Sequence, residues 1–411
     1  MSIERAILVG AGDDRHLGEL NRLVETLGIT VVGSLEQNRR DGAGYLGTGK
    51  REELSQLFAS TRADCVVADD ELTASQARTL ERSSGPVVDR TELIIRIFEA
   101  HASDSASRLE VELADLEYGL PRIKGHNTYF SRLGGGGVTK RGPGEQQLEY
   151  DRRTIRRRMG VIRKKLEGER KSRKTKTSKL RDGGPYSVAL VGYTNAGKTT
   201  ILNALSGSER STEDRLFGTL ETTTRSVTGE SHRPDFVVSD TVGFIRKLPT
   251  QLVHSFASTL EIASEADILV LCADSSSENI HDEIKTVKDT LESMMSEAPR
   301  DLSKRMILCL NKSDLLSENQ GLQLGKRYDE AVLVSAVEDV SQLRDSIYEK
   351  ISYRGIDMSL LIPHSEYEVA TALYGHADIK RKRTTEQGTL LQVTIPKNLY
   401  GRYAQYQVKR H

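Results

Sequence analysis

Residues 1–100 alternate between short apolar runs and longer amphipathic segments. The apolar runs have the length and composition of buried strands, and they lie at Ala6–Gly10, Ile29–Gly33, Cys65–Ala68 and Pro86–Val88. The segments between them have the spacing of helices with one apolar face, and they lie at Leu17–Leu27, Arg51–Ala59 and Thr73–Arg82. Strands and helices in alternation predict a small open parallel sheet with helices on its faces.

Residues 105–182 instead carry two apolar stripes with the same helical period. Each stripe repeats at positions i, i+4, i+7 and i+11, with Leu109, Leu113, Leu116 and Leu120 in the first and Ile155, Met159, Ile162 and Leu166 in the second. Two such stripes predict an antiparallel helical hairpin. The connector from Pro121 to Gly144 is rich in glycine, and connectors of this length are usually functional or disordered.

From Tyr186 to about Arg354 strands and helices alternate again, and sharp motifs follow the strands. Residues 361–411 form a short tail. Its residues Thr389–Ile395 are mostly apolar and predict one strand, which the basic run Lys380–Arg383 precedes.

Composition narrows the class of protein. The 411 residues carry 59 lysines and arginines and 59 aspartates and glutamates, so attraction to nucleic acid or membrane must come from local patches. No apolar run approaches the roughly 20 residues of a membrane helix, and we expect no signal peptide. Cys65, Cys272 and Cys309 lie in strand-like runs without metal-ligand spacing, so we expect buried, reduced thiols. A secreted disulfide-stapled protein and an integral membrane protein are excluded, and we expect a cytoplasmic protein of several domains.

The segment Gly192–Thr199 has the pattern G-x-x-x-x-G-K-T and joins the predicted strand Ser187–Val191 to an amphipathic helix. Glycines at this spacing let backbone N–H groups surround a phosphate, and the helix N-terminus adds a favourable dipole. Lys198 should reach the outer phosphates, and the Thr199 hydroxyl should bind Mg²⁺. The flanking strand and helix disfavour the alternative, a chance glycine turn. The residues expected at the nucleotide are Gly192, Tyr193, Thr194, Asn195, Ala196, Gly197, Lys198, Thr199 and Thr200.

Two later motifs select the base. Asn311, Lys312 and Asp314 belong to the tetrapeptide N-K-S-D, which follows the predicted strand Met306–Leu310. A carboxylate here can accept both the N1–H and the exocyclic amine of guanine, and adenine would leave it unpaired at a cost of several kcal/mol. The pair Ser335-Ala336 follows another strand and matches the last guanine-contacting loop. These motifs indicate GTP rather than ATP.

The motif D-x-x-G, from Asp240 to Gly243, ends the strand that begins at Val237. Asp240 should support Mg²⁺ from its second coordination shell, and the Gly243 amide should sense the γ-phosphate. Four motifs in this order, each at the carboxyl end of a strand, indicate a P-loop GTPase domain. A threonine must also cap the Mg²⁺ and the γ-phosphate, and spacing alone does not choose between Thr219, Thr222, Thr223 and Thr224.

Phe244 occupies the position where many GTPases place a glutamine that orients the attacking water. Because phenylalanine has no hydrogen-bonding group, we expect hydrolysis that is slow alone and accelerated by a partner or an ion. Asn195 bears on this point. Its carboxamide either helps to hold K⁺ beside the phosphates or only hydrogen-bonds within the loop, and the sequence leaves both interpretations open.

Gly44–Arg51 looks like a second phosphate loop, but Arg51 replaces the Mg²⁺-binding hydroxyl and no buried strand precedes it. We favour a glycine turn that begins the following helix, and an auxiliary anion or nucleotide contact is the alternative.

Residues 151–182 contain fifteen Lys or Arg residues and four Asp or Glu residues. The glycine-rich connector nearby adds Lys140, Arg141 and the aromatic residues Tyr129 and Phe130. This excess of positive over negative residues favours contact with an RNA backbone. Bases of the RNA could stack on the aromatic residues. A solvated helix face is the alternative.

The chain resembles the HflX group of translation-factor-related GTPases over nearly its whole length. The segments that carry the resemblance are Tyr45–Leu54, Val88–Ile94, Gly142–Glu145 with Gln147–Glu149, Phe217–Leu220, Asp240–Ile245 and Leu248-Pro249. The resemblance aligns Thr219 with the threonine that caps Mg²⁺ and the γ-phosphate. It also implies binding to the large ribosomal subunit, and in bacterial members the splitting of ribosomes under stress.

Together, these observations predict an α/β protein that has no membrane span and acts as a monomer. Its expected parts are a parallel α/β domain (1–104), an antiparallel helical hairpin with a basic linker (105–182), a P-loop GTPase domain with a Ras-like doubly wound sheet (183–356) and a small α+β tail (357–411). We expect it to bind GTP and GDP with Mg²⁺, and to contact ribosomal RNA through the basic hairpin. A regulatory GTPase with a protein partner and a nucleotide-driven RNA-remodelling enzyme are the alternatives.

Overall fold

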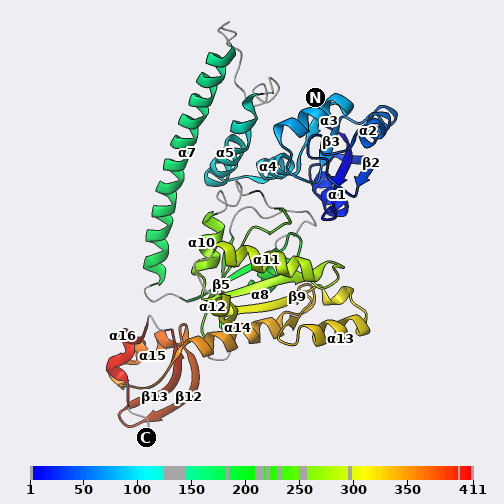
Figure 1. Cartoon of the computed structure of the whole chain (residues 1–411). Helices are drawn as coiled ribbons and strands as arrows, with labels where there is room; N and C mark the ends of the chain where they lie inside the picture. Colours follow the sequence, from blue (N-terminus) through cyan, green and yellow to red (C-terminus); the bar gives the residue numbers. More distant parts are fainter. Residues whose placement is uncertain are drawn as a thin grey trace. The chain divides into compact units, whose positions relative to one another are not determined.

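The computed structural model describes residues 3–124, 144–181, 185–208, 217, 223–229, 233–247, 249, 257–294, 299–396 and 399–408. The chain divides into two compact units (Figure 1). The N-terminal unit comprises Met1–Glu169, Arg215–Leu220 and Lys247–Phe256, and the second unit comprises Arg170–Asp214, Glu221–Arg246 and Ala257–His411. Two segments from the middle of the chain therefore belong to the N-terminal unit.

The N-terminal unit is built on a four-stranded parallel sheet with the order β2-β1-β3-β4. Its strands are β1 (Arg5–Ala11), β2 (Thr30–Gln37), β3 (Cys65–Ala68) and β4 (Val87–Val88). The connecting helices are α1 (Leu17–Thr26), α2 (Thr48–Thr61) and α3 (Ala74–Ser84), and α4 (Arg90–His101) follows the last strand. The predicted parallel α/β fold is confirmed.

Most boundaries differ from the prediction by one or two residues, and the end of β2 and the start of α2 differ by more. Strand β2 continues through Gly33 to Gln37, because it pairs in parallel with β1 as far as Ala11. Helix α2 begins at Thr48 rather than Arg51, with Gly47 at its N-cap. The segment Gly44–Arg51, which looks like a second phosphate loop in the sequence, is therefore a glycine turn that leads into a helix, as we favoured.

A fully buried arginine connects the helices to the sheet. Arg90 is 1% exposed, and its guanidinium lies 2.8 Å from an Asp69 carboxylate oxygen and 2.6 Å from a Glu19 carboxylate oxygen. Its neighbour Asp89 caps α4 by accepting the Glu92 N–H. Burial raises the pKa of the Asp89 carboxyl to about 6, against the opposing charge of Arg122. Buried charges of this kind persist only where partners offset the cost of desolvation.

The helical hairpin is formed by α5 (Ser105–Gly119) and α7 (Gly144–Arg181). The two predicted stripes pack against each other in one cluster, with Leu113, Leu116, Ile123, Ile155, Met159 and Ile162 buried and Leu109, Leu120 and Leu166 at its edge. Most of the predicted connector, including Tyr129, Phe130, Lys140 and Arg141, lies outside the described residues.

The second unit contains a six-stranded sheet with the order β10-β9-β8-β5-β7-β6, in which only β6 runs antiparallel to its neighbour. Its strands are β5 (Tyr186–Gly192), β6 (Thr224–Val227), β7 (Phe236–Asp240), β8 (Ile268–Asp274), β9 (Met306–Asn311) and β10 (Val332–Leu333). The helices are α8 (Lys198–Ser206), α10 (Ala257–Glu265), α11 (Ile280–Met294), α12 (Pro299–Arg305), α13 (Glu318–Arg327) and α14 (Ser341–Arg354).

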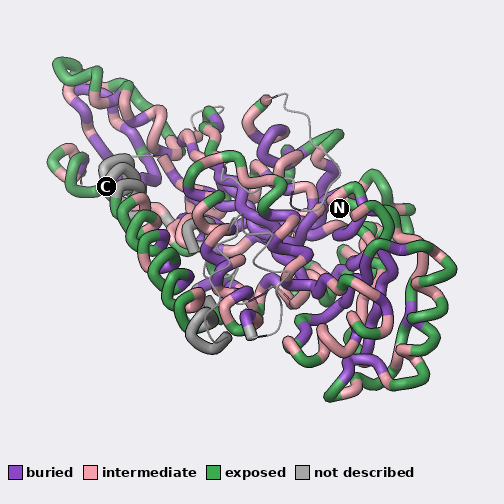
Figure 2. Tube along the Cα trace, turned by 90° about the horizontal axis from the view of Figure 1, so that it is seen from above, coloured by how far each residue is buried: buried purple, intermediate pink, exposed green. Residues whose placement is uncertain are grey.

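The order of this sheet determines where a ligand can bind. The chain adds β6 and β7 on one side of β5 and then β8, β9 and β10 on the other side. The loops that follow the strands on the two sides of β5 therefore separate at its carboxyl end, and open α/β sheets bind ligands at such a point. Buried residues, purple in Figure 2, are concentrated in the strands, and exposed residues, green, lie on the outer turns of helices.

The last part of the chain contains more structure than the single strand we predicted. An antiparallel sheet of order β11-β13-β12 is formed by β11 (Ile356–Ile362), β12 (Asp378–Thr385) and β13 (Gly388–Ile395). Helices α15 (Tyr367–Tyr374) and α16 (Tyr400–Tyr403) accompany it. The basic run Lys380–Arg383 lies within β12, an exposed edge strand without an apolar alternation. The predicted α+β character of the tail is confirmed.

In the described part of the chain, no helix combines the length and the apolar character that spanning a membrane requires.

Candidate nucleotide-binding site

The phosphate loop lies between β5 and α8, at the carboxyl edge of the sheet. Gly192 ends the strand, and a Cβ there would lie 2.2 Å from the carbonyl oxygen of Cys272 on β8. Gly197 has a φ of +81°, and a Cβ there would lie 2.2 Å from Nδ2 of Asn311. Asn195 between them also has a positive φ of +63°. The loop therefore turns so tightly that its glycines cannot carry side chains.

Lys198 begins α8 with its ammonium group turned inward. The residue is 7% exposed, and its Nζ donates to the carbonyl oxygens of Tyr193 at 2.9 Å and Gly192 at 3.3 Å. Burial lowers the pKa of the ammonium, and the negative charge of Asp240 opposes this effect. The two neutral carbonyls offset the cost of burying this positive charge only in part. A phosphate beside Lys198 would supply the opposite charge that offsets the rest.

Thr199 and Asp240 bring two oxygen ligands together below the phosphate loop. The Thr199 hydroxyl donates to an Asp240 carboxylate oxygen at 2.6 Å, and Asp240 is fully buried at the end of β7. A hydroxyl and a carboxylate are the oxygen ligands that Mg²⁺ prefers. The donor set therefore fits the metal that P-loop GTPases use with GTP.

The D-x-x-G segment packs directly onto the phosphate loop. The Phe244 N–H donates to the Gly192 carbonyl oxygen at 3.0 Å, and the Thr194 N–H donates to the Phe244 carbonyl oxygen at 2.8 Å. A Cβ on Gly243 would lie 2.8 Å from Cα of Thr194 and 3.1 Å from Nζ of Lys198. Only glycine fits at this position, and the side of Gly243 where a Cβ would stand faces the buried ammonium.

The guanine motifs are linked to the phosphate loop through Asn311. Its Nδ2 donates to the Ala196 carbonyl oxygen at 3.0 Å, and its Oδ1 accepts the Ala336 N–H at 3.0 Å. The Ser335 hydroxyl donates to an Asp314 carboxylate oxygen at 2.7 Å. One buried carboxamide thus holds the three loops in register, and Asp314 remains exposed at their edge.

The other candidate threonines lie at the start of α8, near or within β6, or outside the described residues. Thr200 lies in the first turn of α8. Thr219 and Thr222 lie outside the described residues. Thr224 is in β6, and its hydroxyl lies 2.8 Å from that of Ser239, so it is an ordinary strand hydroxyl. The Thr223 carbonyl oxygen accepts the Asp240 N–H.

The sequence analysis did not predict that Asp274, at the end of β8, contacts the N-K-S-D motif. Lys312, with a φ of +64°, extends its ammonium to a carboxylate oxygen of Asp274 at 2.7 Å. Asp274 ends β8, so its position at the carboxyl end of a strand was the signal available in the sequence. Cys65, Cys272 and Cys309 are buried and form no disulfide, as expected. A hydrogen bond with Cys272, together with burial, raises the pKa of the Cys309 thiol.

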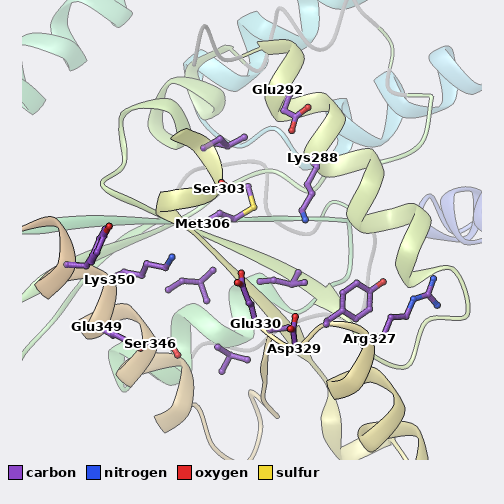
Figure 3. A pocket seen from close by; sticks show the side chains of 17 residues that line it. Lys288, Glu292, Ser303, Met306, Arg327, Asp329, Glu330, Ser346, Glu349 and Lys350 are labelled. Carbon is purple, nitrogen blue, oxygen red and sulfur yellow. The ribbon is translucent and has the colours of Figure 1, made fainter. Parts of the chain in front are cut away.

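A cavity of about 690 Å³ lies elsewhere in the second unit (Figure 3). It is lined by residues that include Met306 at the start of β9, Lys288 on α11 and Lys350 on α14. The nucleotide motifs instead follow the carboxyl ends of the strands, as Asn311 does on β9. The cavity is therefore not the nucleotide site.

Three family models match the chain. They describe a GTP-binding GTPase N-terminal region at residues 14–99, a GTP-binding GTPase middle region at 101–179 and a 50S ribosome-binding GTPase at 187–312. The chain is 44% identical to the GTPase HflX of Caldanaerobacter subterraneus subsp. tengcongensis, over 76% of this chain and 73% of the relative. It is 36% identical to the GTPase HflX of Akkermansia muciniphila, over 99% and 98% of the two chains.

The chain belongs to the HflX family of GTPases. As a member of the family it binds GTP and hydrolyses it, and its motifs G-x-x-x-x-G-K-T and D-x-x-G lie in the GTPase domain. A solved GTP-binding protein of the archaeon Sulfolobus solfataricus in complex with GDP is 21% identical, with a TM-score of 0.43, over 85% of this chain and 98% of that chain. The assignment to the HflX family does not depend on this likeness.

The exposed carboxylate of Asp314 gives a direct test of base selection. Asp314→Asn replaces an acceptor by an amide, which suits xanthine better than guanine. We expect GTP affinity to fall by about tenfold to a hundredfold, from loss of a charged hydrogen bond, while affinity for xanthosine triphosphate rises. Titration with fluorescent nucleotides measures both.

The matched control is Asp329→Asn, since Asp329 lines the cavity away from the motifs. An Asp314→Asn variant that keeps the wild-type preference for GTP would contradict the assignment.

Proposed function

We propose that this HflX-family GTPase binds the large ribosomal subunit in its GTP form, and that the basic face of α7 contacts ribosomal RNA. The observation that carries the proposal is the one-sided distribution of charge on α7. The description of the model that matches the GTPase domain, a 50S ribosome-binding GTPase, supports the same partner.

Helix α7 has an apolar face and a basic face. Ile155, Met159 and Ile162 are buried against α5. Side chains on the other face are exposed and basic: Arg153, Arg156, Arg157, Lys164 and Lys165. Residues spaced by three or four along a helix share a face, so these cations form one stripe. A row of cations matches the regular negative charge of a nucleic-acid backbone.

Two other arginines of α7 have an internal role. Arg158 makes a two-point ion pair with Glu112, at 2.6 and 2.7 Å, and Arg163 lies 2.8 Å from Glu117. These pairs hold α7 against α5, so both arginines are less available to a partner. The exposed stripe, rather than the whole set of arginines, is therefore the proposed contact.

Within the nucleotide site we propose the following roles. Lys198 binds the outer phosphates, the Gly243 amide senses the γ-phosphate, and Thr219 caps the metal and the γ-phosphate. Mg²⁺ would be held by Thr199 and Thr219 and supported by Asp240, and when bound it neutralises phosphate charge. Asn311 and Asp314 read guanine together with Lys312, Ser335 and Ala336.

The proposed reaction cycle follows from these roles. GTP orders the segments around Thr219 and Phe244, and hydrolysis releases them. If the ribosome binds the GTP form better, it must also tighten GTP binding, because coupling is reciprocal. We propose that the protein acts as a monomer, and that its resemblance to ribosome-splitting members extends to dissociation of stalled ribosomes.

Hydrolysis should be slow in the isolated protein. Phe244 is buried, at 6% exposure, and carries no group that could orient a water. We therefore propose that K⁺, held in part by the Asn195 carboxamide, supplies the missing positive charge beside the phosphates.

Co-sedimentation tests the ribosomal partner. We expect large subunits to retain the protein with a non-hydrolysable GTP analogue and to release it with GDP. Arg156→Glu combined with Arg157→Glu should weaken retention at least about tenfold and flatten its salt dependence, because each lost phosphate contact reduces the salt slope by roughly one.

The matched control is Lys285→Glu with Lys326→Glu, which changes the net charge equally at exposed positions on α11 and α13. If large subunits retain both double variants equally, α7 does not contact RNA through Arg156 and Arg157. If retention of the wild type does not depend on salt concentration, the result instead favours a protein partner.

The proposed ion site has its own test. Hydrolysis in K⁺ should be at least about tenfold faster than in Na⁺ at equal ionic strength. Asn195→Gly should abolish the difference, since glycine keeps the positive φ of +63° and removes only the carboxamide. Equal rates of phosphate release in the two salts would rule out the potassium site.

A further inference from the structure

The phosphate-loop residue Thr194 carries a buried hydroxyl that the roles proposed above do not use. The residue is 7% exposed, and in the described part of the chain its Oγ1 has no hydrogen-bond partner. Burying a hydroxyl without a partner costs free energy. Native proteins rarely keep such a group unless a ligand, an ion or a water completes it. The Thr194 hydroxyl therefore needs a partner that the chain does not supply.

Two neighbouring threonine hydroxyls have partners within the fold. The Thr199 hydroxyl donates to an Asp240 carboxylate oxygen at 2.6 Å. The Thr241 hydroxyl donates to the Leu190 carbonyl oxygen at 2.7 Å, which ties the residue after β7 to β5. Thr194 differs from both, because its hydroxyl makes no such bond to any described residue.

The Thr194 side chain lies where Gly243 and Lys198 meet. A Cβ on Gly243 would lie 2.8 Å from Cγ2 of Thr194 and 3.1 Å from Nζ of Lys198. Both groups are close to this one point, so the Thr194 side chain is a neighbour of the buried ammonium. Lys198 and the Gly243 amide are the groups proposed above to bind the outer phosphates. Thr194 therefore lies at the γ-phosphate end of the nucleotide site.

Backbone hydrogen bonds fix Thr194 in this position. Its N–H donates to the Phe244 carbonyl oxygen at 2.8 Å, and the Phe244 N–H donates to the Gly192 carbonyl oxygen at 3.0 Å. A threonine side chain branches at Cβ and has few rotamers available on a fixed backbone. The hydroxyl is thus preorganised, which is the condition under which a polar group contributes most to catalysis.

Phe244 leaves one catalytic task without a side chain. Many GTPases orient the attacking water with a glutamine at this position, and Phe244 has no hydrogen-bonding group. Because Thr194 is bonded to the Phe244 backbone, it lies beside the position that the glutamine would occupy. A hydroxyl donates one hydrogen and accepts through two lone pairs, so it can contact a water and a phosphate oxygen at once.

We propose that Thr194 is a catalytic residue of GTP hydrolysis, whose hydroxyl orients the attacking water in place of the missing glutamine. The hydroxyl accepts a hydrogen bond from the water and donates its own hydrogen to a γ-phosphate oxygen. The water oxygen bonds to the γ-phosphorus, and the bond from that phosphorus to the β–γ bridging oxygen breaks. A proton of the water passes to a γ-phosphate oxygen, so the products are GDP and phosphate and Thr194 is unchanged. This assignment rests on the γ-phosphate position proposed above.

The test uses the full-length chain without ribosomes and compares Thr194→Val with Thr194→Ser. Valine removes the hydroxyl and keeps the shape of the side chain, so kcat for GTP should fall by about tenfold to a hundredfold. KM should change by less than about threefold, because a water-orienting group acts mainly in the transition state. Thr194→Ser keeps the hydroxyl and should retain most of the wild-type rate. The loss in Thr194→Val should be the same in K⁺ and in Na⁺, whatever the outcome for the potassium site.

Thermal stability separates a catalytic role from a structural one. Because the Thr194 hydroxyl has no partner in the described part of the chain, Thr194→Val should not lower the Tm of the nucleotide-free protein. Tyr403→Phe is the matched control, since Tyr403 is fully buried on α16 and its hydroxyl also has no partner among the described residues. It should keep both kcat and Tm close to wild type.

Three results would overturn the assignment: a wild-type kcat in Thr194→Val, an equal loss of kcat in Thr194→Ser, or a lowered Tm in Thr194→Val. Lys198→Ala tests the γ-phosphate position separately. If Lys198→Ala also turns over GTP at the wild-type rate, the proposed position of the phosphates is wrong. If Lys198→Ala is inactive and Thr194→Val has a wild-type kcat, only the catalytic role of Thr194 is wrong.

Discussion

The close contact between Gly243 and the phosphate loop constrains the rest of the site. There is no room for a side chain at Gly243, since a Cβ would meet Thr194 at 2.8 Å. Two backbone hydrogen bonds of Phe244 tie the same segment to the loop. The buried ammonium of Lys198 lies beside it. A phosphate that binds at this point would meet both the ammonium and the Gly243 segment, which supports the proposal that this segment senses the γ-phosphate.

Two of the segments that carry the resemblance to the HflX family meet within the N-terminal unit. Tyr45, in the first of them, donates to Asp70, and Arg90, in the second, pairs with Asp69. Asp69 and Asp70 directly follow β3, so both segments hold the loop at the carboxyl end of that strand. The basic face of α7, the proposed ribosomal contact, belongs to the same unit.

Much of the fold could be predicted because its signals are local. Buried strands appear as apolar runs, and Gly192, Gly197 and Lys198 appear at a spacing that the phosphate loop requires. Strand β12 was missed because an exposed edge strand of Lys and Arg carries no apolar pattern. The contact of Lys247 with Asp70 joins residues 177 positions apart. Arg40 and Tyr45, which also hydrogen-bond to Asp70, come from a third region of the chain. Contacts between such distant residues leave no periodic pattern in the sequence, so they could not be predicted from it.

The central claim is that this GTPase, in its GTP form, contacts the large ribosomal subunit through the basic face of α7. Amide hydrogen exchange of the full-length protein bound to a non-hydrolysable GTP analogue measures this directly, by comparing the free protein with the protein mixed with large subunits. We expect exchange to slow along Arg153–Lys165 of α7, while strands β11 and β13 serve as an unchanged reference. Exchange along α7 that is identical with and without large subunits would contradict this claim.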